Sequence, residues 1–131
     1  MREILFRGKR VEDLKWAEGF YFREAGHFIK ELPSAVSMPT HIVYPETIGQ
    51  YTGLKDKNGK RIFEGDILEG QGYDEEDGYA VVTWDDGAFW VGNKHVCGTF
   101  CENYYGHSFE VIGNIHDNPE LLEEAWETQK L

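Results

Sequence analysis

Residues 45–68 read PETIGQYTGLKDKNGKRIFEGDIL, and the interpretation of the whole chain starts from this stretch. The pair Asn58-Gly59 near its centre is typical of a β-hairpin tip, because both residues accept the positive φ that a type I′ turn needs. Alternating polar and apolar residues on either side predict two half-buried strands, after which a further strand opens at 67–68. The residues that shape these turns and strand starts are Gly49, Gly53, Asn58, Gly59, Gly65 and Asp66.

Three motifs give the chain a family resemblance. The run IGQYTGLKDKNGKRIFEGDIL at 48–68, REILFRGKR at 2–10 and FEVIGNIHDNPELL at 109–122 resemble the YopX family of phage and prophage proteins, in the same order. Together they span nearly the whole chain. The resemblance implies a phage or prophage accessory protein without an assigned biochemical activity, so it predicts an architecture and no reaction.

Length and composition favour one compact domain made mostly of strands. A chain of 131 residues matches the usual domain size of about 100 to 200 residues. Aromatic residues make up 15% of it, which is too many for a disordered chain and suits the flat packing surface of a sheet. The fold class predicted is therefore mainly β with minor α.

The charge balance restricts the possible partners. Thirteen Lys and Arg against 24 Asp and Glu give a net charge of −11, which disfavours contact with nucleic-acid phosphates or anionic membranes. No apolar run approaches the roughly 20 residues that span a bilayer. Basic and acidic residues interrupt the N-terminus where a signal peptide would be apolar. A cytoplasmic location is expected, with Cys97 and Cys101 as reduced thiols.

The N-terminal part, 1–48, is predicted to be a β subdomain. Its strands are expected at 2–7, 14–22, 26–31 and 40–44, and the first two should lie side by side. The segment 32–39 has a proline near each end and no period, so it is expected to be a loop.

Residues 49–116 are predicted to form a small β-barrel of the Src-homology-3 type. A strand at 66–69 is followed by a polar loop at 70–78. Two strands, 79–84 and 88–91, flank the turn residues Asp85-Asp86-Gly87, and a last strand is expected at 109–115. Closing such strands into a barrel removes exposed sheet edges.

A helix is predicted within 117–131. Asn118 is a suitable N-cap, Pro119 suits the first helical position, and the glutamates that follow favour the positive end of the helix dipole. The face that carries Trp126 either docks on the protein's own barrel or packs on a neighbouring subunit.

The basic residues of the central hairpin are the first candidate for a binding site. Lys55, Lys57, Lys60 and Arg61 surround its tip, whereas 62–93 contains no Lys or Arg and nine Asp or Glu. Three interpretations stay open. The tip is an ordinary solvated turn, it binds a nucleic-acid groove, or it docks on the acidic face of the next subunit.

A metal site is the second candidate. His95, Cys97 and Cys101 lie close in sequence, with His107 and His116 downstream, and the spacing of the two cysteines lies within the range of zinc sites. Buried apolar cysteines are the commoner arrangement. No metal or other cofactor is therefore predicted.

Carboxylates and aromatic residues complete the candidates. Glu64, Asp66, Asp85 and Asp86 could provide acid and base groups, but turn formation explains Asp85 and Asp86 better, and bonding to backbone amides explains Asp66 better. Six aromatic residues of the second half of the chain form a further candidate set. On strands, where side chains alternate between the two faces, about half of them are expected to point into the core. Those that face outward would form a binding patch, of which the candidates are Trp90, Tyr104 and Tyr105; the full set is Trp84, Phe89, Trp90, Phe100, Tyr104 and Tyr105.

No catalytic triad and no phosphate-binding glycine loop can be identified. The prediction is a non-enzymatic protein that binds other proteins and self-associates, with a host or phage protein as a further partner. An association with nucleic acid is the alternative, either through the basic tip or by mimicking DNA with the acidic face. A metal-dependent enzyme is the third possibility.

Overall fold

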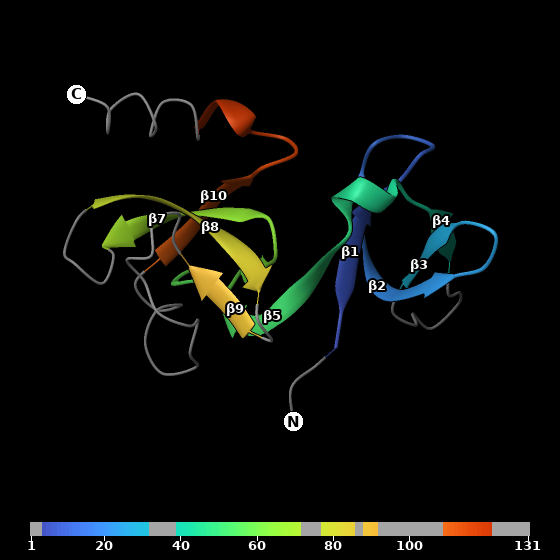
Figure 1. Ribbon diagram of the computed structural model, residues 1–131, viewed down its shortest axis with the longest axis horizontal. Coiled ribbons are helices and arrows are strands. Elements are labelled where there is room, and N and C mark those ends of the chain that lie inside the picture. The colour runs from blue at the N-terminus through green and yellow to red at the C-terminus, as the bar shows by residue number, and fades with distance from the viewer. Residues whose placement is uncertain (1–3, 32–38, 72–76, 86–87, 92–108, 122–131) are drawn as a thin grey trace. The chain divides into compact units, whose positions relative to one another are not determined.

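The computed structural model describes residues 4–31, 39–71, 77–85, 88–91 and 109–121. The chain forms two compact units, Met1–Tyr51 and Thr52–Leu131. Both are built from antiparallel strands, so the protein is mainly β, as the sequence predicts (Figure 1). Within the part of the chain that the structure describes, no helix has the length and apolar character needed to cross a membrane.

The first unit is an antiparallel sheet with the strand order β4-β3-β2-β1-β5. Each of the four strands predicted in this part of the chain overlaps an observed one, and β1 pairs with β2 as expected. The 3-10 turn η1 (Pro45–Thr47) leads into the last strand. The strands are β1 (Phe6–Lys9), β2 (Trp16–Arg23), β3 (His27–Glu31), β4 (Thr40–Ile42) and β5 (Gly49–Lys55).

The sheet of the first unit curls, so that the end of β4 returns to the end of β1. Arg10 and Val43 form an antiparallel bridge. The N–H of Val11 donates to the carbonyl of Ile42, and the N–H of Tyr44 donates to the carbonyl of Lys9, each at 2.9 Å. These bonds occupy the edge of β4 that faces away from β3.

The curled sheet encloses a small apolar core. Ala17, Ile29 and Val43 are buried on its inner face, where Phe6, Tyr21 and Ile48 pack against them. Gly19 shows how little room there is, since a Cβ at this position would lie 2.0 Å from the carbonyl oxygen of Lys30. The inner side of β2 therefore carries two small residues, Ala17 and Gly19, before Tyr21.

The second unit contains the rest of β5 and five further strands. β6 (Arg61–Phe63) pairs with β5 to make the predicted central hairpin. The other four, β7 (Asp66–Gln71), β8 (Asp77–Asp85), β9 (Ala88–Val91) and β10 (Phe109–Asn114), form a sheet in the order β10-β7-β8-β9. The buried core of this unit consists of Ile62, Leu68, Val82, Phe89 and Phe109, with Val111 packed against it.

The second unit differs from the predicted Src-homology-3-like barrel. Its four-stranded sheet has β10 at one end and β9 at the other, and no ladder between the described residues closes it into a ring. The hairpin predicted around Asp85 to Gly87 is present, because Asp85 pairs with Ala88 and Trp84 with Phe89. Local alternation therefore identified the strands correctly but not the closure, which depends on long-range pairing.

Strands β7 and β8 extend into the segment predicted as a loop, 70–78. Gly70 pairs with Gly78 and Gln71 with Asp77. Ladder hydrogen bonds between neighbouring strands offset the poor strand propensity of glycine and aspartate here.

The predicted C-terminal helix begins at Pro119 and is described to Leu121. The side-chain oxygen of Asn118, predicted to cap this helix, accepts the N–H of Asn114 at 3.3 Å. The backbone carbonyl of Asn118 accepts the N–H of Leu121 at 3.1 Å. The face predicted around Trp126 lies outside the described residues.

Candidate functional site

The tip of the central hairpin is a type I turn followed by a left-handed glycine. The N–H of Gly59 donates to the carbonyl of Asp56 at 3.0 Å, and the N–H of Asp56 donates to the carbonyl of Lys60 at 2.8 Å. Gly59 has φ of +83°, whereas Asn58 is not among the residues with positive φ. The prediction of a type I′ turn was therefore wrong, although the hairpin and its tip lie where the sequence places them.

The carboxylate of Asp56 explains the turn type. One of its oxygens accepts the N–H groups of Asn58 and Lys60, at 2.8 and 2.9 Å. The other accepts the N–H of Val111, on β10, at 2.9 Å. A carboxylate that bonds the backbone two residues ahead favours this turn over a type I′ turn.

The pKa of Asp56 is below its usual value of 3.8. Burial by itself would raise the pKa, since the side chain is only 5% exposed. The hydrogen bonds from the N–H groups of Val111, Lys60 and Asn58 lower it, and so does the charge of Lys60. Asp56 is therefore a charged structural group that joins the hairpin tip to β10.

The basic residues of the tip lie together on the hairpin, as predicted. Lys55, Lys57 and Lys60 are exposed and Arg61 is half-buried. Lys57 also makes two contacts within its own unit. Its backbone N–H donates to the carbonyl of Phe109 at 3.0 Å, and its ammonium lies 3.9 Å from the carboxylate of Glu110. The side-chain amide of Asn58 donates to the same carboxylate at 3.2 Å.

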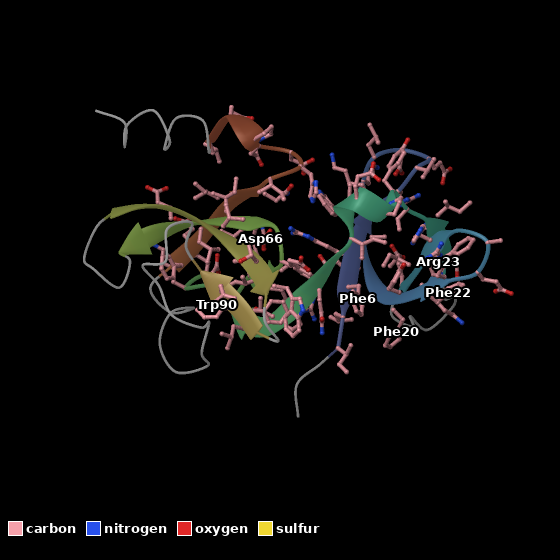
Figure 2. All side chains as sticks on the ribbon, in the orientation of Figure 1. Phe6, Phe20, Phe22, Arg23, Asp66 and Trp90 are labelled. Atoms are coloured by element: carbon pink, nitrogen blue, oxygen red, sulfur yellow. The ribbon has the colours of Figure 1, made fainter. Side chains whose placement is uncertain are left out.

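The predicted structural residues of the central stretch occupy turns and strand starts. Gly53 and Gly65 both have φ of +91°, and Gly49 begins β5, opposite Arg7 on β1. Asp66 is buried at the start of β7 (Figure 2), where its carboxylate accepts the N–H of Phe63 at 2.8 Å. Asp66 thus bonds a backbone amide, as the structural interpretation of this residue predicts.

The predicted carboxylate set does not assemble into a described acid–base pair. Glu64 is half-buried in the turn between β6 and β7, next to the buried Asp66. Asp85 ends β8 and Asp86 lies outside the described residues. Among these predicted carboxylates, the geometry assigns a structural role to Asp66.

The predicted aromatic set is divided between the two faces of the second unit's sheet. Phe89 is buried in the core, and Trp84 packs on it edge to face with the ring centroids 4.7 Å apart. Trp90 follows Phe89 along β9 (Figure 2), so it lies on the opposite face, where it is half-buried. Phe100, Tyr104 and Tyr105 lie outside the described residues.

Of the five predicted metal ligands, one lies within the part of the chain that the structure describes. His95, Cys97, Cys101 and His107 lie outside the described residues. His116 is described, and its backbone N–H donates to the side-chain oxygen of Asn114 at 3.0 Å. Among the residues that the structure describes, no three His, Cys, Asp or Glu side chains gather in a way that could hold a metal ion.

Sequence reasoning did not identify an exposed apolar surface on the first unit. Phe20 and Phe22 follow one another on the outer side of β2 (Figure 2), and they are 47% and 38% exposed. Phe28 on β3 and Ile42 on β4 lie on the same side, since Phe22 pairs with Phe28 and Phe28 with Ile42. We call these four residues the outer patch.

A signal for the outer patch exists in the sequence of β2, WAEGFYFR. Its small residues Ala17 and Gly19 alternate with the larger residues at 16, 18, 20 and 22. Aromatic residues of β2 lie on both sides of the sheet. Tyr21 packs into the core, whereas Phe20 and Phe22 lie outside, beside the small inner residues Ala17 and Gly19.

Known proteins resemble this chain over most of its length. The family model described as YopX protein matches residues 7–123. The crystal structure of protein EF1440 from Enterococcus faecalis is similar, with a TM-score of 0.62 and 29% sequence identity over 93% of this chain and 99% of that one. No curated protein matches the chain.

Proposed function

The chain belongs to the YopX family, and from this premise we propose that it is a non-enzymatic phage or prophage accessory protein that binds proteins, among them a second copy of itself. The observation that supports self-association is that most of the strongly exposed apolar side chains among the described residues lie on the unit of zero net charge in a strongly acidic chain.

The net charge is confined to one unit. Met1–Tyr51 contains seven Lys and Arg and seven Asp and Glu, so its net charge is zero. Thr52–Leu131 contains six Lys and Arg against 17 Asp and Glu, a net charge of −11. Two copies that meet through their first units bring together neutral surfaces, whereas contact through their second units opposes like charges.

The exposed apolar side chains are also distributed unequally between the two units. Among the described residues, eight large hydrophobic side chains are strongly exposed, and six of them belong to the first unit. Contiguous apolar surface on a soluble protein marks an interaction site more often than an ordinary exterior. These six are Ile4, Val11, Leu14, Phe20, Phe22 and Ile42, and the other two are Trp84 and Ile115.

Head-to-tail docking of the basic tip on an acidic face has weaker support. Lys57 already lies beside Glu110 of its own unit, and both side chains are about half exposed. The two modes of assembly respond to salt in opposite ways. Docking between opposite charges weakens when salt screens it, whereas apolar contact between acidic chains is unchanged or strengthened, because their mutual repulsion is screened.

Light scattering during size-exclusion chromatography, at low and at high salt, tests the proposal. The expected result is a species larger than the monomer whose fraction at fixed protein concentration stays constant or rises with salt. Dissociation on adding salt would instead support charge-driven docking. A monomer under both conditions would rule out self-association.

Association with a basic partner is a second candidate, favoured by the charge of the second unit. Glu69 on β7 and Glu110 on β10 are direct cross-strand neighbours, an arrangement of like charges that disfavours the sheet by itself. A surface of this kind suits a protein that competes with DNA for a basic protein. Competition between this protein and duplex DNA for a basic DNA-binding protein of the host would test it.

A further inference from the structure

We propose that the outer patch is the surface through which a second copy of the chain docks, face to face and around a two-fold axis. This inference rests on the proposed self-association and assigns it to four residues, Phe20, Phe22, Phe28 and Ile42.

The outer patch is continuous across three strands. Phe22, Phe28 and Ile42 form one cross-strand row, and Phe20, Lys30 and Thr40 form the next. The rings of Phe22 and Phe28 stack with their centroids 5.1 Å apart and their planes 12° from parallel. Ile42 is 57% exposed at the end of the first row. Stacking orders the two rings before any partner arrives, which lowers the entropy lost on binding.

The rings of the outer patch cannot turn into the core of their own unit. Side chains alternate between the two faces of a strand, and the inner face of β2 is already occupied at Ala17 and too narrow at Gly19 for even a Cβ. The backbone therefore fixes Phe20 and Phe22 on the outside. Any burial of these rings therefore has to come from outside the core of this unit.

The geometry points to contact through the face of the sheet and not through its edge. The carbonyl of Ile42 accepts the N–H of Val11, and the N–H of Tyr44 donates to Lys9. These bonds use backbone groups of the edge of β4 that a β-strand from a partner would otherwise need. Side-chain packing on the outer patch is the mode of association left at this side of the unit.

The charges around the outer patch favour a second copy as the occupant. Lys30 lies directly across from Phe20, and Glu18 lies two residues before Phe20 on the same face. In a two-fold contact each residue meets the residues that its own symmetry mate presents. This face carries charges of both signs, since Arg7 and Lys9 on β1 lie beside Glu18 and Trp16. Because the unit as a whole has zero net charge, two such faces can meet without net repulsion.

Two single substitutions in the full chain test the assignment, Phe20→Glu on β2 and Ile42→Lys on β4. Leu14→Glu is the matched control, because Leu14 is 58% exposed in the same unit and lies in a turn outside the outer patch. Sedimentation velocity over a range of concentrations gives the dissociation constant of each variant. Both patch variants are expected to raise it about thirtyfold or more, as loss of a central interface side chain does, and the control by less than about threefold.

Far-UV circular dichroism and the thermal midpoint of each variant show whether its fold is intact. Association at wild-type affinity by both folded patch variants overturns the assignment and leaves self-association standing. A wild-type chain that is monomeric throughout overturns both. A monomeric chain that binds oligothymidylate, and loses this binding in Phe20→Glu, overturns the dimer in favour of base stacking on the same rings.

Discussion

At the scale of single residues, Asp56 has the clearest structural role. Its carboxylate is buried, accepts three backbone N–H groups, and joins the hairpin tip to Val111 on β10. An aspartate beside a turn commonly forms local bonds of this kind. The sequence does not show the bond to a residue 55 positions away, and that contact accounts for the burial of the side chain.

Asp56→Asn is expected to destabilise the protein by about 2 kcal/mol, because hydrogen bonds to a buried charged group are replaced by weaker ones and an amide faces backbone donors. Urea unfolding at pH 7 measures the loss. Glu12→Gln, on a side chain that is 79% exposed, is the control and should change the stability by less than about 0.5 kcal/mol.

The difference in stability between the wild-type protein and Asp56→Asn is expected to depend on pH. Because the folded-state pKa of Asp56 is lowered, its stabilisation is complete above the unfolded-state pKa near 4 and disappears as the pH falls through the folded-state value. The difference in unfolding free energy between wild type and Asp56→Asn should therefore be constant from pH 7 to about pH 5 and shrink below about pH 4. A difference that grows on acidification would contradict the role given to this carboxylate.

Replacement of Gly59 or of Gly19 by alanine should destabilise the protein to very different extents. Gly59 has positive φ but open space around it, so Gly59→Ala should cost about 1 to 2 kcal/mol from backbone strain alone. Gly19→Ala would place a Cβ 2.0 Å from a carbonyl oxygen on β3, so β2 and β3 must separate, and the loss should exceed that of Gly59→Ala by several-fold. Chemical denaturation of both variants checks the order, and equal losses would contradict the tight inner face.

At the scale of elements, strand positions were predictable from the sequence and their long-range arrangement was not. Alternation over a few residues identified every described strand, and Asp-Gly and Asn-Gly marked the hairpins. The turn type at Asn58 depended on the hydrogen bonds from the N–H groups of Asn58 and Lys60 to the carboxylate of Asp56, which the Asn-Gly pair by itself does not indicate. Closure of the barrel depended on pairing between distant strands, which local alternation does not encode.

The outer patch escaped prediction for a related reason. The run Phe20-Tyr21-Phe22 places aromatic rings on both sides of β2, so alternation alone does not indicate which side faces the core. The curl of the first unit places Tyr21 inside and Phe20 and Phe22 outside. Curvature is a property of the whole sheet, fixed by contacts such as the bridge between Arg10 and Val43.

Docking of the hairpin tip on β10 predicts a local pattern of amide hydrogen exchange. In Asp56→Asn the N–H of Val111 should exchange faster by more than the global loss of stability explains, because its acceptor is weakened. The N–H of Gly65, which donates to the carbonyl of Val82 away from the tip, should change only by the global amount. Equal acceleration at both amides would mean that the tip and β10 are not linked through Asp56.

At the scale of the whole molecule, the chain divides its properties between its two units. The neutral first unit carries most of the strongly exposed apolar side chains of the described residues, and the second carries the entire net charge of −11. Under the proposed self-association, this division would give the acidic chain one region where a second copy meets no net repulsion.

The molar mass of the intact chain in solution tests this account most directly. Sedimentation equilibrium at physiological ionic strength, over a hundredfold range of protein concentration, is expected to show a mass that rises from 15.1 kDa toward twice that value. A mass that stays at 15.1 kDa at every concentration would contradict it.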